Sequence, residues 1–245
     1  MFYEALMSEA EKNLQAEVRK FVREDVSHDL IRAMDKDEIQ YPREFVKQLA
    51  AQKLLGLRFD RRWGGRGLPW TAEVIAEEEI GVLGSALGCA FVMPSIVGEA
   101  LHVFGTDDQK ARFLKPILQG ELICAEALTE PRGGSDFFGA TTRAKLAGDH
   151  FVINGQKRFV VGATEADVFL VYCLTNFDES AHKYNRISAL MVERGPGVET
   201  AYTYGLLGTR GGGTGRLVFR DVKLSLIHIS EPTRQLMSSR MPSSA

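Results

Sequence analysis

The segment ALTEPRGGSD, residues 127–136, holds the densest set of side chains able to do chemistry in this sequence. Pro131 is expected to end a strand, and the two glycines that follow it let the backbone turn tightly. Ser135 and Asp136 place a hydroxyl and a carboxylate on the same loop. Backbone amides of a glycine-rich turn, with a serine hydroxyl, can hold phosphate oxygens. An ordinary Pro-Gly turn with a Ser-Asp cap explains the same residues, so the segment alone leaves both interpretations open.

Other features favour structure over chemistry. The acidic run at 77–79 is typical of a solvated helix face, and His102 on an apolar helix is typical of a core histidine. The arginine pair at 61–62 is expected on an exposed loop. The segment GTRGGGTG, residues 208–215, lacks the Lys-Ser/Thr of a P-loop and precedes a strand, which excludes a phosphate loop of that kind. No residue is therefore assigned as catalytic.

Composition indicates the class of protein. Thirty Lys and Arg against thirty-two Asp and Glu give a net charge of −2, which argues against a general nucleic-acid binder or a membrane-surface protein. Three scattered cysteines without a CxxC predict reduced thiols and no metal site. The N-terminal residues mix acids and bases, unlike a signal peptide. Gly, Pro and charge are expected to interrupt every apolar run before the ~18 residues of a membrane span. We expect a soluble, cytoplasmic protein.

The first 120 residues are predicted to be helical. An apolar stripe at i, i+4, i+7 and i+8 predicts a helix around 14–22. Pro42 begins a second helix that ends at Gly56, and Thr71 caps a third. Residues 85–104 are apolar nearly all round and form the central buried helix. A fifth helix begins at Thr106 or Asp107.

After Gly120 the pattern predicts strands. FVINGQKRFVV, residues 151–161, is interpreted as a hairpin that turns at Asn154-Gly155. Further strands are expected at 167–174, 187–193 and 216–222. The fold class is α+β, because helices come first and strands second. The expected domains are a helical N-terminal domain (1–120), an antiparallel β-barrel-like middle domain (121–223), and a Ser-rich tail (224–245) that resembles read-through translation.

Two segments together resemble the acyl-CoA dehydrogenase family. TEPRGGSD at 129–136 and NGQKRFVV at 154–161 are similar to its two flavin-contacting segments. The similarity continues through 103–131 and 205–224. This resemblance implies an FAD enzyme that removes hydrogen from the α and β carbons of an acyl-CoA thioester. A carboxylate takes the α-proton, and the β-hydrogen leaves as hydride to flavin N5. It also implies electron-transferring flavoprotein as acceptor and a homo-oligomeric parent.

The resemblance implies roles for individual residues. Four strand residues would run along the isoalloxazine ring, with Thr129 bonded to its pyrimidine side. Gly134 and Ser135 would lie near the FAD pyrophosphate, and Ser135 near the CoA chain as well. The implied cofactor contacts are Glu126, Ala127, Leu128, Thr129, Gly134, Ser135, Phe159, Val160 and Val161.

The sequence departs from the family pattern in three places. Glu126 stands where the family usually has an aromatic residue. Val161 stands where a threonine hydroxyl would bond near N5, which removes a hydrogen bond worth ~0.5–1.5 kcal/mol. The pattern stops at Lys223 or Leu224, whereas the family continues into a four-helix bundle that carries the catalytic glutamate in most members. The expectation is therefore a C-terminally truncated dehydrogenase, inactive or nearly so, and prone to aggregate.

Two alternatives remain open from the sequence. One is another flavoenzyme of the superfamily, such as an acyl-CoA oxidase, a nitroalkane oxidase or a flavin monooxygenase. The other is a non-enzymatic fragment that binds acyl-CoA. Oxygen reactivity of the reduced flavin would distinguish the first, and acyl-CoA binding without flavin the second.

Overall fold

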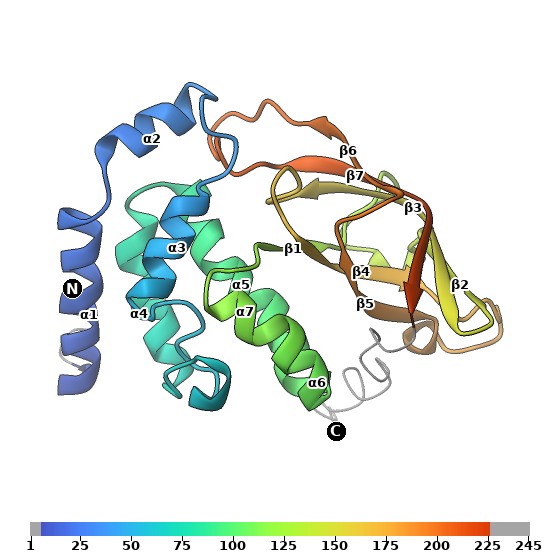
Figure 1. The fold of residues 1–245 in the computed structure, drawn as a ribbon, viewed down its shortest axis with the longest axis horizontal. Helices are drawn as coiled ribbons and strands as arrows, with labels where there is room; N and C mark the ends of the chain where they lie inside the picture. The colour runs from blue at the N-terminus through green and yellow to red at the C-terminus, as the bar shows by residue number, and fades with distance from the viewer. Residues whose placement is uncertain (1–5, 226–245) are drawn as a thin grey trace.

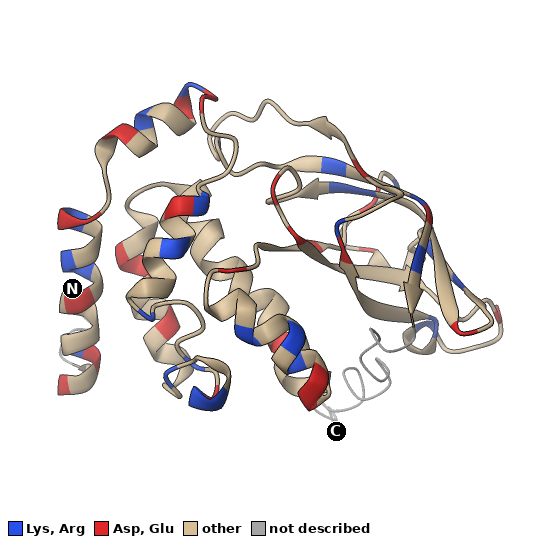
Figure 2. Cartoon of the chain, in the orientation of Figure 1, with Lys and Arg blue, Asp and Glu red and all other residues tan. Residues whose placement is uncertain are grey.

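A computed structural model describes residues 6–225 of the chain. Helices fill one side of the molecule and a curled sheet fills the other (Figure 1). Basic and acidic residues are interspersed along both parts of the chain (Figure 2). This arrangement confirms the α+β class, with helices before strands.

The helical part has five main helices and a short, broken sixth segment. The main helices are α1 (Glu9–Glu24), α2 (His28–Asp35), α3 (Arg43–Ala51), α4 (Trp70–Gly81) and α5 (Ser85–Phe104). The last segment consists of α6 (Asp107–Gln109), a π-helical turn (Lys110–Leu114) and α7 (Lys115–Leu118).

Several helix signals work as predicted. The apolar stripe of α1 is buried, and a Ser8–Glu11 capping box starts the helix. Thr106 starts α6 with a second capping box, through Gln109. Other boundaries were wrong. Helix α4 begins at Trp70 with Pro69 before it, so Thr71 is not its cap. Helix α3 ends at Ala51, five residues before Gly56.

Helix α5 is the centre of the helical part and is largely buried. It is also the one described helix that is long and apolar enough to cross a membrane, although 56% of its apolar window lies inside the protein. The buried helix predicted over residues 85–104 is therefore confirmed, whereas the expectation that Gly, Pro and charge keep every apolar run shorter than a membrane span does not hold for it. Core helices meet the same length and composition criterion.

Within the described residues, the sheet has seven strands in the order β1-β4-β2-β3-β7-β6, with β5 paired to β4. The bounds are β1 (Cys124–Ala127), β2 (Arg143–Ala147), β3 (His150–Val160), β4 (Val168–Leu174), β5 (Ile187–Glu193), β6 (Val198–Thr203) and β7 (Gly215–Ser225). Strand β1 pairs with β4 in parallel, so the sheet is mixed and not purely antiparallel. Strands β2 and β6 were not predicted.

The predicted hairpin at 151–161 was wrong. Strand β3 runs unbroken through Asn154 and Gly155, and its true hairpin partner is β2. A register shift against β7 occurs between Ile153 and Gly155. The Asn154 amide donates to the Asp221 carboxylate at 2.9 Å, and its side-chain oxygen accepts from the Asp221 backbone N–H. The Asn-Gly pair therefore marks a bulge and not a turn.

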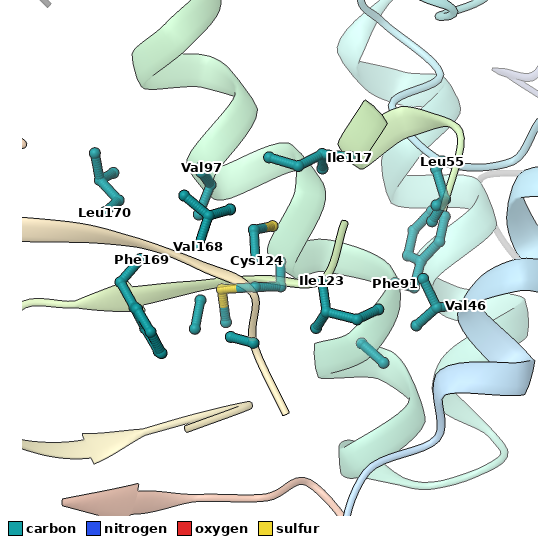
Figure 3. Close-up of a cluster of buried hydrophobic side chains, with 14 of the residues drawn as sticks. Val46, Leu55, Phe91, Val97, Ile117, Ile123, Cys124, Val168, Phe169 and Leu170 are labelled. Carbon is teal, nitrogen blue, oxygen red and sulfur yellow. The ribbon is translucent and has the colours of Figure 1, made fainter. Parts of the chain in front are cut away.

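One continuous core joins the helical part to the sheet (Figure 3). Val97 of α5 and Ile117 of α7 lie over Cys124 of β1 and Val168 of β4. Strand β7 extends to Ser225 with Leu224 buried, two residues into the stretch that the sequence analysis treated as a tail. Residues 226–245, the rest of that stretch, lie outside the described residues.

Candidate functional site

The two flavin-like segments lie side by side, as the sequence analysis expected. The Arg158 backbone N–H donates to the Thr129 carbonyl at 2.7 Å. One residue earlier on each segment, the Lys157 ammonium donates to the Leu128 carbonyl at 3.0 Å. These two bonds hold the chain beyond β1 against the end of β3. We call the surface formed by Thr129 and Phe159 the shelf.

A buried ion pair between Lys157 and Glu130 holds this junction from the interior of the protein. Lys157 and Glu130 have 0% and 3% of their side chains exposed, and Nζ lies 2.9 Å from Oε1. The Glu130 carboxylate also accepts from the backbone and hydroxyl of Thr141 and the backbone N–H of Thr142. Burial alone would raise the pKa of Glu130, but the Lys157 hydrogen bond and charge, with the Thr141 bonds, lower it to about 2. Glu130 is therefore ionised and structural.

The glycine-rich turn folds back on itself next to this pair. Glu130 and Gly133 exchange backbone hydrogen bonds. A Cβ added to Gly134 would lie 3.3 Å from the Thr129 hydroxyl, so the turn approaches Thr129 closely. Asp136 pairs with Arg132 at 2.8 Å. Glu130 and Asp136 thus both organise the turn itself, and Ser135 is exposed at the turn's surface.

Phe159 has an unusual backbone on the other side of the shelf. Its φ is 54°, a left-handed conformation that bulky residues rarely adopt and that costs of order 1–3 kcal/mol. The ring is 50% exposed and stacks on Tyr204, with ring centroids 4.6 Å apart. Such strain clusters at ligand-binding sites. The fold therefore holds a large aromatic ring outward where burial would be the usual outcome.

The remaining predicted contacts divide into those that reach the surface and those that do not. Ala127 and Val160 are buried in the core, so only their backbone atoms could touch a ligand. Leu128 and Val161 are half-buried. Glu126 is half-buried, and the Tyr172 hydroxyl donates to it at 3.1 Å. Burial raises the pKa of Glu126, and the Tyr172 bond offsets part of that rise.

Sequence analysis missed the outer wall of the site. A pocket of about 450 Å³ adjoins the shelf and is lined by Pro131, Gln156, Arg158, Tyr202, Tyr204 and Arg216. The two tyrosines alternate on β6 and its end, a period-2 aromatic pattern that could have indicated a strand face. The aromatic rings can stack on a planar ligand, and the Thr129 hydroxyl and the guanidinium groups can donate hydrogen bonds to it. Guanidinium groups in particular suit phosphate oxygens.

The features set aside by sequence analysis are mostly structural. His102 packs against the Phe59 ring, and the arginine at 62 pairs with Asp107 on the surface. The acidic run is a partial exception, because burial raises the pKa of Glu77 to about 7. Within residues 6–225 no three His, Cys, Asp or Glu side chains gather to hold a metal. The three cysteines are free thiols.

Comparisons with known proteins place the chain. The family model described as acyl-CoA dehydrogenase, N-terminal domain, matches residues 8–121, and the middle-domain model matches 125–222. Isovaleryl-CoA dehydrogenase of Pongo abelii is 33% identical over 226 residues, which is 91% of this chain and 53% of that protein. A short-chain acyl-CoA dehydrogenase of Clostridium acetobutylicum is 32% identical over 84% of this chain and 54% of its own length.

A solved structure agrees with these matches. The acyl-CoA dehydrogenase of Geobacillus kaustophilus is 29% identical, with a TM-score of 0.83 over 93% of this chain and 60% of that one. The chain spans about half the length of the curated relatives that it matches. Both domain models and the fold agree with the residues that carried the resemblance. The chain belongs to the acyl-CoA dehydrogenase family.

Proposed function

We propose that this chain supplies the flavin shelf of an FAD-dependent acyl-CoA dehydrogenase, which forms the α,β double bond of an acyl-CoA thioester. The observation that carries the proposal is the junction of Thr129 with Phe159. It joins a hydroxyl, a half-exposed aromatic ring and a close-packed glycine turn, with the backbone tied by the 2.7 Å bond from Arg158. Family membership supports the same chemistry.

The proposed roles follow from where each side chain lies. The Thr129 hydroxyl would bond the pyrimidine edge of the isoalloxazine, and the Phe159 ring would cover its face. The Gly134 and Ser135 turn would offer backbone N–H groups and a hydroxyl to phosphate oxygens. When bound, FAD would serve as the hydride acceptor. The protein groups orient it and exclude water from one side.

We further propose that the 245-residue chain, assayed by itself, has little or no dehydrogenase activity. Glu130 cannot act as base, because its pKa of about 2 and its bonds to Lys157 keep it ionised and occupied. Glu126 is held by Tyr172. Loss of general-base assistance typically lowers a rate by 10²–10⁴-fold. Electron-transferring flavoprotein as acceptor, a homo-oligomeric parent and a cytoplasmic location stay predictions.

The test is to titrate FAD into the purified chain and follow its visible absorbance and fluorescence. We expect saturable binding that Phe159→Ala weakens about three- to tenfold, the equivalent of the ~0.5–1.5 kcal/mol of an aromatic pair. Thr129→Val should weaken it by a similar factor. The control is Phe177→Ala, which removes an exposed ring in the loop between β4 and β5. Flavin binding that none of these changes alters would refute the proposal.

Two outcomes would favour the alternatives. Rapid oxygen consumption by the photoreduced, FAD-loaded chain would indicate an oxidase or monooxygenase. Binding of an acyl-CoA with no detectable flavin binding would indicate a non-enzymatic module. The dehydrogenase proposal predicts slow reaction of the reduced flavin with oxygen, and flavin binding that does not require acyl-CoA.

A further inference from the structure

The pocket beside the shelf contains two arginines whose charge the described residues leave uncompensated. Arg158 lies on β3 and Arg216 on β7, and both line the cavity of about 450 Å³. The guanidinium of Arg158 donates to the Tyr204 hydroxyl at 3.1 Å, a neutral partner. Nε of Arg216 is buried and has no hydrogen-bond partner. Within residues 6–225, neither side chain forms an ion pair.

Neighbouring arginines on the same sheet behave differently. Arg220, four residues further along β7, pairs with Glu199. Arg194 donates to the backbone carbonyls of Ala163 and Ala166 at 2.6 Å each. Arg158 and Arg216 therefore have neither the carboxylate partner of Arg220 nor the two backbone acceptors of Arg194. A buried, unbonded N–H of a charged group carries the full cost of its desolvation unless a ligand bonds it.

The other walls of the pocket are aromatic or neutral. Tyr204 stacks on Phe159, and Tyr202 meets Tyr204 edge-on with centroids 5.1 Å apart. The Tyr202 side chain is 54% exposed. None of the residues that line the pocket is acidic, so nothing within it would repel an anion. The volume lies within the range of small-molecule sites and exceeds what a single small anion fills.

We propose that the Arg158–Arg216 pocket is an oxyanion-binding site that holds a phosphate or carboxylate group of a larger organic ligand. The planar guanidinium fork matches the geometry of both groups and bonds them with two parallel N–H donors. The tyrosine rings provide the flat surface against which the rest of that ligand packs. This site is separate from the Gly134–Ser135 turn and goes beyond the proposed flavin contacts.

The test measures binding of two probe anions to the full chain by calorimetry at low and moderate salt. Pyrophosphate represents phosphate sources and glutarate represents carboxylates. We expect at least one to bind, and the Arg158→Gln/Arg216→Gln double variant to weaken its binding at least tenfold. Arg220→Gln is the matched control, since it removes an arginine of β7 that is already paired, and it should change binding less than twofold. The probe that binds more tightly identifies the anion source.

Folding of each variant is checked by its thermal transition. If the double variant does not fold, Arg158→Gln alone is expected to weaken binding several-fold, because Arg158 is half-buried at the pocket wall. Equal binding of the probes by wild type and Arg158→Gln, or no binding of either probe by wild type, would overturn the proposal.

Riboflavin, which has no phosphate, separates this proposal from the flavin shelf. Riboflavin binding should survive Arg216→Gln and weaken in Phe159→Ala. Anion binding without any riboflavin binding would refute the shelf and leave the oxyanion site standing. Riboflavin binding without anion binding would refute the oxyanion site and leave the shelf standing.

Discussion

Lys157 and Arg158 are consecutive cations on β3 with opposite surroundings. Lys157 points inward, is fully buried, and bonds the Glu130 carboxylate and the Leu128 carbonyl. Arg158 lines the outer pocket, and among the described residues its side chain hydrogen-bonds a tyrosine hydroxyl and lies over the Phe159 and Tyr204 rings. Because side chains alternate across a strand, one segment builds both a closed structural tie and an open binding surface. Charge alone therefore does not separate structural from ligand-binding residues, whereas completeness of hydrogen bonding does.

The helical part contains a closed network of the first kind. The Arg58 guanidinium is 7% exposed, bonds Glu73 and Ser95, and pairs with Glu99. It also stacks on the Trp70 ring at 3.7 Å. Every charge there has a partner, so we interpret this network as structural. Glu77 on the same helix as Glu73 is the contrast, because its Oε2 is buried without a partner.

The largest loss of stability is expected from breaking the buried Lys157–Glu130 ion pair. Lys157→Met leaves Glu130 buried without its cation, and loss of one partner of a buried pair costs about 3–5 kcal/mol of unfolding free energy. Arg158→Met should lower the free energy of unfolding by less than about 1 kcal/mol, because Arg158 is only half-buried, whereas Lys157 is fully buried. Urea unfolding of both variants measures the two values. Equal losses of unfolding free energy in the two variants would show that the two faces of β3 do not differ in this way.

Acid should weaken the same Lys157–Glu130 ion pair in the unmutated protein. The folded-state pKa of Glu130 is about 2, below its ordinary value of 4.5. A lowered folded pKa contributes stability above pH 4.5 that is lost progressively as the pH falls toward 2. The unfolding midpoint in urea should therefore fall across this window in the wild type. The fall should be smaller in Glu130→Gln, and an identical pH profile would contradict the assignment.

Phe159 permits a sharper test of backbone strain. Phe159→Gly removes the left-handed penalty together with the ring stack, so the two effects oppose and stability should change by less than about 1 kcal/mol. Phe159→Val places a β-branched side chain at a φ of 54°, and should be about 1–2 kcal/mol less stable than the glycine variant. Thermal unfolding in parallel distinguishes them. A valine variant as stable as the glycine variant would show that this φ is not strained.

The smallest expected effect concerns Glu77. Burial raises its folded pKa to about 7. A raised carboxyl pKa favours the folded state when the group is protonated, so this contribution is lost as the pH rises from 4.5 to about 7. Glu77→Gln should raise the melting temperature by a few degrees at pH 8 and by less at pH 5. The exposed Glu38→Gln is the control and should change neither.

Much of the fold could be predicted because local signals agreed with it. The stripe of α1 and the Thr106 cap depend only on nearby residues, and both were found as expected. Helix α2 was missed, because only Met34 of its eight residues is buried and its apolar pattern is short. The strand at 151–161 was misread as a hairpin because Asn-Gly serves bulges as well as turns. Its bulge is fixed by Asp221, which lies 67 positions away.

The site shows the same limit. The motifs correctly placed the two segments side by side, joined where the Arg158 N–H meets the Thr129 carbonyl. They did not indicate that Lys157 would be the partner of Glu130, 27 positions away, nor that Arg158 and Arg216 would share a pocket. Those pairings depend on the registers of β3, β7 and β6, which sequence alone does not specify. Local chemistry was predictable and its long-range partners were not.

The most direct test of the shelf is a map of backbone amide shifts on adding FAD to isotope-labelled chain. We expect the largest changes at Thr129, Gly134, Arg158 and Phe159, and we expect them to saturate together with a single affinity. Changes confined to the helical part, or no saturable change at these four amides, would contradict it.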